Sequence, residues 1–422
     1  MYQFNKVMAV LLTIWVCCPY VTQNTGLLFG TGVALLWGMT RLLCVASKPT
    51  FMIRMDTLTL GAFLVSPAVS FLVFRRVYTS FDPYTFLPML FIFFIGFYMY
   101  RFYAEKKDYP FLGLLALVAL AATLLGAVMT LYYLEIDPMI AKSVSQSDNS
   151  NFLAYQKSGI GSFGFIYLLL FITIACLPLL FKTLPAVRKK KTMKLALAVS
   201  MAVFMLCIIK AGFSAAILLF ICGGVLWLIS FIRNKWFRYG AAVLLVFAIV
   251  FLKQPFGQWL VDFQIENDMV RERIHDIGYF LMTGESGVHT SARFEDFQRS
   301  LESFFGYPLF GYNFRLGGLP VISPGGHAEW MDLFAVYGLA GGIPLVATLI
   351  QKSRYIQATV QQQMGYTYYS IICIVCIIYG FLDPFLRIYH IGFAMFLVVP
   401  AIPYLPFVFK GKKTPLQRRP AI

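Results

Sequence analysis

Long apolar stretches recur along almost the whole chain, and they restrict the possible folds more than any other feature. A helix that crosses a bilayer needs about 20 mostly apolar residues, and the stretches of this length are separated mainly by short polar segments. The sequence is 59% hydrophobic and 13% charged, whereas soluble domains have roughly 45–50% apolar and 25% charged residues. The pattern predicts an all-α polytopic membrane protein and excludes a large separate soluble domain.

About twelve spans are predicted by this length requirement. They lie at residues 6–21, 26–46, 57–74, 84–102, 111–133, 161–181, 194–209, 213–232, 237–253, 328–350, 367–383 and 391–409. An even number of spans places both termini on the same side of the membrane. The chain then divides into residues 1–253 with spans one to nine, a large loop at 254–327, and residues 328–422 with the last three spans and a basic tail.

The distribution of charge predicts which side is which. Lys and Arg number 35 and Asp and Glu 19, giving a net charge of +16 that by itself could indicate nucleic-acid binding. With these spans, most basic residues fall on the side of the termini and most acidic residues fall on the other. Because membrane proteins concentrate Lys and Arg in cytoplasmic segments, both termini are expected in the cytoplasm and the 254–327 loop outside. Anionic membrane lipid explains the basic tail, and no nucleic-acid partner is expected.

Cysteine placement gives no indication of redox or metal chemistry. All eight cysteines fall inside apolar stretches rather than in loops, where a disulfide framework or zinc site would lie. Cys373 and Cys376 have the spacing of a redox motif, but their setting, IICIVCIIYG, is typical of a membrane core. No metal or other cofactor is therefore expected.

The large loop is the first place to look for function, because loops held by a rigid scaffold tend to carry it. Residues 271–282 and 291–306 are amphipathic and are predicted to form helices on or near the membrane surface. All four histidines also fall on the outer side or at its edge. No internal repeat is visible, so a transporter built from inverted repeats is not supported.

One stretch carries a resemblance to a known family. Residues 291–313, SARFEDFQRSLESFFGYPLFGYN, are followed at 325–341 by GGHAEWMDLFAVYGLAG. An Arg at the start of a helix, a P-L-F-G turn and a His before a glycine-terminated helix occur here in the order typical of the O-antigen ligase and Wzy-type polymerase superfamily, which this chain resembles. Its members are GT-C-like glycosyltransferases of the bacterial inner membrane, and the twelve-span layout extends the resemblance over most of the chain.

The resemblance implies an activity. Such enzymes transfer a glycan from an undecaprenyl diphosphate carrier to an acceptor hydroxyl at the periplasmic face, without a metal. The expected partners are this lipid-linked donor, a glycan or lipid A core acceptor, membrane lipid and other polysaccharide assembly proteins. The residue types suit the chemistry, because Arg can bind a diphosphate with a bidentate fork and His, with an unperturbed pKa of about 6.5, can accept a proton near neutral pH.

Arg293 and His327 are the residues that match this chemistry. Arg293 is the first candidate for the diphosphate contact; the alternative is a solvated charge paired with Glu295 or Asp296. His327 matches the catalytic histidine of the family and is the candidate base for the acceptor hydroxyl. Its alternative is a capping or packing role at the start of span ten.

Residues around His327 are candidates for supporting roles. Gly325 and Gly326 allow a ligand to approach the helix N-terminus closely, or form a flexible turn. Glu329 and Asp332 lie near the membrane boundary, where a carboxylate needs partners; either could orient His327 or bind a sugar hydroxyl. Trp330 could stack on a sugar, or be an interfacial aromatic residue.

The chain departs from the family pattern at one basic position. Family members usually carry Arg at the outer junction before the large loop, where this chain has Phe213. Lys210, one turn earlier, is the candidate second diphosphate contact, although Lys cannot form a fork and could instead be an interfacial snorkelling residue. Weaker candidates for carrier or glycan contacts are Arg299, Arg315 and the pair Arg75–Arg76, each of which could equally be a solvated or headgroup-facing charge.

Three classes of function remain. The first is a lipid-linked glycan transferase, with a polymerase of surface polysaccharide slightly favoured over a ligase to lipid A core. The second is a transporter or flippase, which predicts ionisable residues in the middle of spans; here they lie mostly at span ends. The third is a membrane scaffold, which would not need an Arg and a His in one enlarged outer loop.

Overall fold

The computed structural model describes most of the chain as helix. The described residues are 1–45, 55–74, 83–144, 155, 157–181, 191–232, 234, 236–237, 240, 251–263, 268–283, 288–314, 322–365 and 367–408. None of these residues is in a β-strand, so the all-α prediction is confirmed for this part of the chain.

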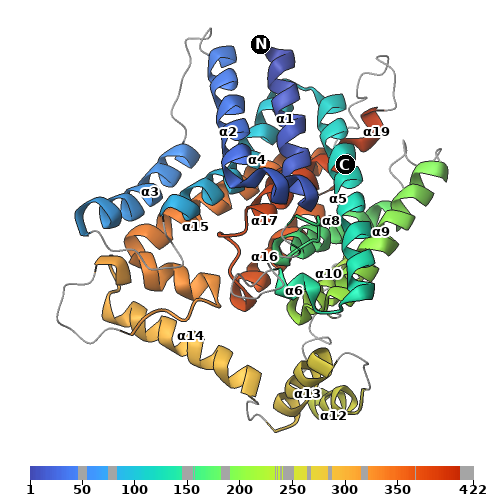
Figure 1. Ribbon diagram of the computed structural model, residues 1–422, viewed down its shortest axis with the longest axis vertical. Helices are drawn as coiled ribbons and strands as arrows, with labels where there is room; N and C mark the ends of the chain where they lie inside the picture. Colours follow the sequence, from blue (N-terminus) through green and yellow to red (C-terminus); the bar gives the residue numbers. More distant parts are fainter. Residues whose placement is uncertain are drawn as a thin grey trace.

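The described residues form a succession of helices (Figure 1). In chain order they are α1 (Tyr2–Cys17), α2 (Pro19–Val45), α3 (Met55–Phe74), α4 (Pro83–Glu105), α5 (Tyr109–Ile136), α6 (Ile140–Ser143), α8 (Phe163–Phe181), α9 (Lys191–Ala211), α10 (Ser214–Ser230), α12 (Lys253–Asp262), α13 (Asp268–Thr283), α14 (Val288–Gly306), η2 (Tyr312–Phe314), α15 (Glu329–Met364), α16 (Thr367–Leu382), α17 (Tyr389–Phe393), η3 (Ala394–Val398), α18 (Val399–Ala401), η4 (Ile402–Tyr404) and α19 (Leu405–Val408).

Within the described ranges, 7 helices are long and apolar enough to cross a membrane, as expected of a polytopic membrane protein. They are Pro19–Leu43, Phe86–Glu105, Tyr109–Ile136, Phe163–Leu180, Lys194–Ala211, Glu329–Gln362 and Tyr389–Val408. Shorter apolar helices coincide with four further predicted spans, at Tyr2–Cys17, Leu58–Val69, Ser214–Ser230 and Thr367–Leu382. The predicted span at 237–253 lies largely outside the described residues.

Two predicted spans differ from the structure in their form. Span ten was expected to end at residue 350, but α15 continues to Met364. The helix ends there because Gly365, with a φ of +83°, leaves the helical conformation. The last span is not a uniform α-helix: it passes through π-helical and 3₁₀ turns between residues 394 and 404. Prolines at 400, 403 and 406 remove backbone donors there, which favours such irregular turns.

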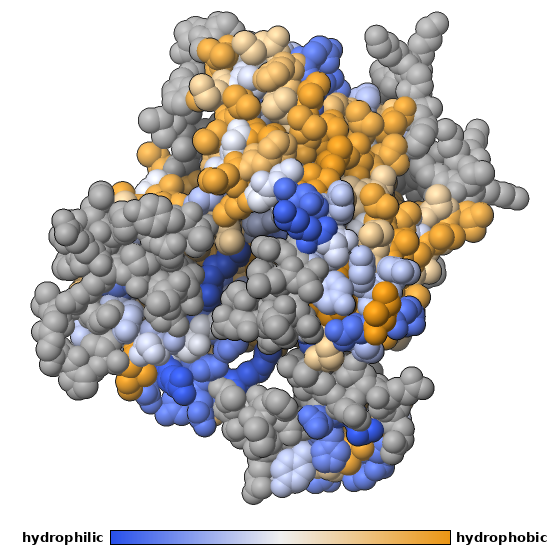
Figure 2. Space-filling model, in the orientation of Figure 1, coloured by the Kyte–Doolittle hydropathy of each residue, from blue (hydrophilic) through white to orange (hydrophobic). Residues whose placement is uncertain are grey.

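The amphipathic segments of the large loop are confirmed as helices, α13 and α14. A further helix, α12, begins where span nine was expected to end and packs against α13, with Gly278 close to Leu260 and Val261. Apolar side chains cover the upper part of the molecule, whereas polar ones gather at the lower end, around α12–α14 (Figure 2).

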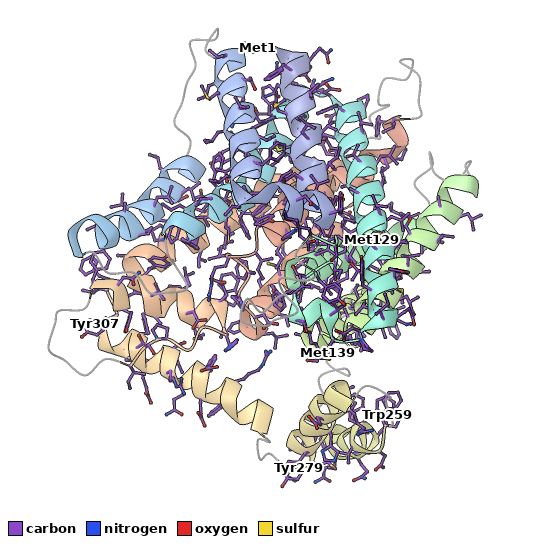
Figure 3. The ribbon with its side chains drawn as sticks, viewed as in Figure 1. Met1, Met129, Met139, Trp259, Tyr279 and Tyr307 are labelled. Carbon is purple, nitrogen blue, oxygen red and sulfur yellow. The ribbon has the colours of Figure 1, made fainter. Side chains whose placement is uncertain are left out.

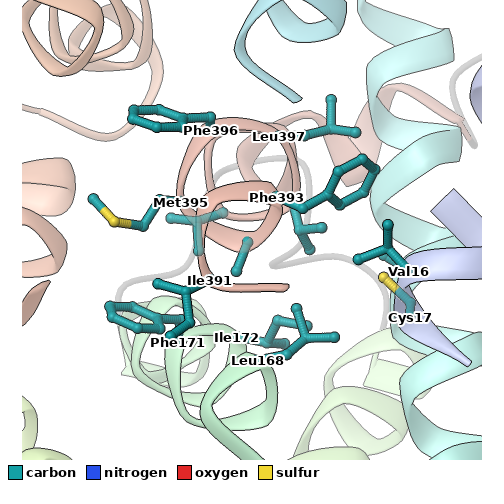
Figure 4. Close-up of a cluster of buried hydrophobic side chains, with 14 of the residues drawn as sticks. Val16, Cys17, Leu168, Phe171, Ile172, Ile391, Phe393, Met395, Phe396 and Leu397 are labelled. Atoms are coloured by element: carbon teal, nitrogen blue, oxygen red, sulfur yellow. The ribbon is translucent and has the colours of Figure 1, made fainter. Parts of the chain in front are cut away.

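The start of the chain and the α12–α13 helices lie at opposite ends of the molecule (Figure 1). Met1 lies at the end opposite Trp259 and Tyr279 (Figure 3). Near that first end, the Lys6 ammonium is 2.6 Å from Asp108, which also accepts a hydrogen bond from the Tyr2 hydroxyl. Between the ends, α8 and the last helical stretch pack Leu168, Phe171, Ile391, Phe393 and Phe396 into an apolar core with the end of α1 (Figure 4).

Helix α15 is broken within its third turn, at Gly338, and the P-L-F-G turn fills the break. Gly338 has a φ of +61°, so the following N–H groups lose their helical acceptors. Leu339 N donates to the carbonyl of Pro308 at 2.8 Å, and Ala340 N to that of Leu309 at 2.9 Å. A Cβ at Gly338 would come within 2.5 Å of the Leu309 carbonyl, so this close approach requires glycine.

Replacing Gly338 with Ala should therefore destabilise the protein. The positive φ alone costs an L-residue about 1–2 kcal/mol, and the clash with Leu309 adds to it, so we expect a loss of roughly 2 kcal/mol or more in detergent-solubilised protein. Thermal unfolding measures the loss. Gly38→Ala in α2 is the control, because a Cβ there meets nothing within 4 Å; equal melting temperatures for the two variants would contradict the docked turn.

Candidate active site

One face of α14 brings together the residues of the candidate site. Arg293, Asp296 and Ser300 are spaced three and then four residues apart, which places them along one side of a helix. Arg293 contacts the segment after α16, Asp296 lies beside His327, and Ser300 binds Asp332 at the start of α15. Three segments that are distant in the sequence therefore meet on this helix face.

Arg293 is oriented by the segment that joins α16 to α17. Its Nη1 donates to the carbonyl of Leu382 at 2.7 Å, and its Nη2 lies 3.5 Å from Asp383 Oδ1. Asp383 is buried and accepts a hydrogen bond from the Tyr167 hydroxyl at 2.9 Å. The Arg293 side chain is 48% exposed, so its guanidinium is held in place yet remains accessible to an anion.

His327 stands at the surface in the turn before α15. Its side chain is 58% exposed, and its Nε2 lies 3.7 Å from Asp296 Oδ2. The N-cap of α15 is Ala328, so His327 does not cap this helix. The Asp296 carboxylate therefore lies beside the exposed imidazole, which has a ring nitrogen that can accept a proton.

The two glycines before His327 serve the turn itself. A Cβ at Gly325 would come within 2.5 Å of Asp296 Cα, so this glycine lets the turn lie directly on the α14 backbone. Gly326 has a φ of +89°, which favours glycine for the bend. The space beside Gly325, which was predicted to admit a ligand, is therefore occupied by the α14 backbone.

Asp332 anchors the same turn from below. Its carboxylate is 0% exposed and accepts hydrogen bonds from the Ser300 hydroxyl at 2.6 Å, from Gly326 N at 3.1 Å and from Ala328 N at 3.0 Å. Ser300 Oγ in turn accepts from Gly325 N at 2.9 Å. The turn that carries His327 is thus tied both to α14 and to the first turn of α15.

Glu329 holds the segment between α16 and α17. It is 0% exposed, and its Oε2 accepts from Phe385 N at 2.7 Å and Leu386 N at 3.1 Å. Its Oε1 has no hydrogen-bond partner among the described residues. The side chain predicted to bind substrate is therefore committed to the protein interior in this structure.

Arg387 and Asp383 belong to the site although the sequence analysis did not select them. Arg387 Nη2 lies 3.4 Å from the carbonyl of Gly326, and the guanidinium is within electrostatic reach of Glu329 and Asp332. Both residues lie at or in the short connection between the last two apolar spans, on the predicted outer side. Two opposite charges in so short a connection could have indicated from the sequence that it belongs to a site.

Trp330 packs between helices. Its indole N–H donates to the carbonyl of Ile377 at 2.8 Å, and its ring lies 5.0 Å from that of Phe385. Gly380 on α16 leaves the room that the indole occupies. The sugar-stacking role of Trp330 stays a prediction, and the structure assigns its N–H to α16.

Lys210, the predicted second cation, has a carboxylate as its partner. Lys210, at the end of α9, pairs with Glu135 at the end of α5. Phe213, where the family pattern has a basic residue, is buried, and the ammonium of Lys142 lies 5.8 Å from its ring centroid. Lys142, which the sequence analysis did not select, therefore brings a positive charge to the Phe213 position.

A row of aromatic rings connects this position with Arg293. Phe213 lies 5.5 Å from Phe163, and Phe163 lies 4.7 Å from Tyr167, measured between ring centroids. Tyr167 binds Asp383, the ion-pair partner of Arg293. Lys142 and Arg293 thus stand at the two ends of one connected row of side chains.

The remaining predicted cations are Arg299, Arg315 and the Arg75–Arg76 pair. Arg299 is exposed and lies 3.7 Å from both Glu295 and Asp296 on its own helix. Arg315 and the Arg75–Arg76 pair lie outside the described residues. Of the predicted site residues, the structure thus brings Arg293, His327 and the two carboxylates of α15 together.

Comparison with known proteins adds no relative: no protein-family model matches the sequence, and no curated protein matches it significantly.

Removing the Glu329 carboxylate should loosen the connection between α16 and α17. In Glu329→Ala the N–H groups of Phe385 and Leu386 lose their acceptor, and a buried donor left without a partner costs about 1–3 kcal/mol. We expect faster amide exchange at both residues, measured by hydrogen–deuterium exchange. Glu302→Ala on exposed α14 surface is the control; exchange that is equally slow in both variants would contradict the role of Glu329.

Proposed function

We propose that this chain is a membrane glycosyltransferase that moves a glycan from undecaprenyl diphosphate to an acceptor hydroxyl at the outer face of a bacterial inner membrane. One observation carries the proposal: a single face of α14 holds an accessible Arg293 and, one turn later, the Asp296 that faces His327. A cation for a leaving diphosphate and an imidazole for an attacking hydroxyl are the two groups that such a transfer requires.

The proposal includes the topology. Twelve spans with both termini in the cytoplasm place α12–α14 in the periplasm. The opposed positions of Met1 and of α12–α14 support this arrangement (Figure 3), as does the excess of Lys and Arg on the predicted inner side.

The reaction follows from these groups. His327 takes the proton of the acceptor hydroxyl, whose oxygen forms a bond to the anomeric carbon of the donor glycan. The bond between that carbon and the diphosphate oxygen breaks, and the electron pair leaves with the diphosphate. Arg293 stabilises the charge that develops there, and Asp296 stabilises the imidazolium that His327 becomes.

Lys142 is a further candidate for a second cation at the diphosphate, beside Lys210. It is 9% exposed and lies over Phe213, the position that carries a basic residue in the family that this chain resembles. Lys210, the candidate predicted from the sequence, pairs with Glu135.

Polymerisation of a surface polysaccharide is our first choice of reaction, and ligation to lipid A core is the alternative. Both use the same donor chemistry and differ in the acceptor. A deletion strain separates them: single-repeat capping of lipid A core indicates a lost polymerase, whereas bare core with accumulated carrier-linked polymer indicates a lost ligase. Carrier-linked precursor that accumulates on the cytoplasmic side would instead indicate a transporter.

His327→Ala should abolish transfer while the protein remains folded in the membrane. The side chain is exposed and does not cap α15, so its loss removes the base with little effect on stability. Long-chain polysaccharide made by a complemented deletion strain is the measurement. His275→Ala, at an exposed position on α13, is the control. Wild-type amounts of long-chain polysaccharide in the His327 variant would contradict the role of His327 as the base.

Arg293→Lys should reduce turnover about 100-fold, the usual effect of removing one contact that stabilises transition-state charge. Lys keeps the charge but cannot bind Leu382 and a phosphate oxygen with one planar group. Transfer rates of purified protein with a lipid-linked donor measure the effect. The matched control is Arg271→Lys on α13, and similar turnover in the two variants would argue against a diphosphate contact at Arg293.

A further inference from the structure

Asp332 is a buried carboxylate at the start of a membrane-crossing helix, where an unpaired charge is costly. Its two oxygens take three donors from three places: the Ser300 hydroxyl on α14, Gly326 N in the turn before α15, and Ala328 N at the N-cap of α15. Arg387 lies within electrostatic reach and offsets the charge. This number of donors satisfies the carboxylate without any ligand.

The three donors come from the two segments that form the proposed site, α14 and the turn that carries His327. Ser300 lies two turns after Arg293 and one turn after Asp296 on the same helix. Gly326 and Ala328 flank His327 directly in the sequence. A displacement of Asp332 would therefore change the position of His327 relative to both Arg293 and Asp296.

We propose that Asp332 is a positioning residue that acts through Ser300 to hold the His327 turn in register with α14. This inference rests on the proposed function, and it assigns to Asp332 no contact with substrate. Its side chain is fully buried, so it reaches the reaction only through the two segments that it joins.

The short hydroxyl bond to Ser300 carries this coupling. Ser300 Oγ donates to Asp332 at 2.6 Å and accepts from Gly325 N at 2.9 Å. Ser300→Ala removes both bonds but leaves the bonds of Asp332 to Gly326 and Ala328. Asp332→Asn keeps the shape, but its single amide oxygen replaces only one of the two carboxylate oxygens. The NH₂ group therefore removes either the acceptor of Ala328 N or the acceptor shared by Ser300 and Gly326 N.

Steady-state kinetics distinguishes positioning from a general loss of structure. Arg293 keeps its own contacts with Leu382 and Asp383, so in Ser300→Ala we expect the donor KM to change by less than about 3-fold. A misplacement of about 1 Å can cost roughly 100-fold in rate, and we expect a fall of this order in kcat. The control is Gln298→Ala, which removes an exposed pair with Glu302 on the same helix and should keep wild-type kcat.

A double variant tests whether the two residues act as one unit. Because they share one hydrogen bond, Ser300→Ala combined with Asp332→Asn should lower kcat by less than the product of the two single losses. Multiplicative losses, or a Ser300→Ala enzyme with wild-type kcat, would overturn the inference.

Amide exchange gives a readout that does not depend on transfer activity. We expect Gly325 N to exchange about 10-fold faster in Ser300→Ala, and whichever of Gly326 N and Ala328 N faces the NH₂ group to do so in Asp332→Asn. Unchanged exchange at these residues would overturn the inference even in an active enzyme. A wild-type protein without transfer activity would overturn the proposed function, while faster exchange in both variants would still support the coupling of the His327 turn to α14.

Discussion

Two buried carboxylates at the start of α15 determine the arrangement of the candidate site. Glu329 and Asp332 lie three residues apart, on neighbouring positions of the first helical turn, and both accept backbone N–H groups from outside their helix. Glu329 holds the connection that orients Arg293, and Asp332 holds the turn that carries His327. Without these acceptors, the donors of both irregular segments would be unsatisfied near the membrane boundary, at a cost of several kcal/mol each.

The charged groups of the site form an exposed set and a buried set. The exposed set contains the guanidinium of Arg293 and the imidazole of His327, which lie beside the carboxylates of Asp383 and Asp296 respectively. The buried set contains Glu329 and Asp332, with Arg387 within electrostatic reach of both. The buried set holds the segments that carry or orient the exposed side chains, and the exposed set remains available for an anionic or hydroxyl-bearing substrate. This division explains why so many ionisable side chains share one small region of an apolar protein.

Much of this arrangement could be predicted from local sequence. Apolar length identified the helices, and the spacing of residues 291–306 predicted α14 and the position of Arg293 on it. Contacts between distant segments could not be predicted in this way. The roles of Arg387 and Lys142 depend on which helices pack together, and a carboxylate such as Glu329 looks the same in sequence whether it faces substrate or the interior. The irregular last span could have been suspected from its three prolines, but the type of each turn depends on packing.

The docking of the Pro308–Gly311 turn into the break of α15 also bears on how the protein is made. The carbonyls of Pro308 and Leu309 precede Gly338 in the chain, so the ribosome delivers the acceptors before the helix that needs them. The free N–H groups at the break of α15 can therefore be satisfied as soon as this helix is made.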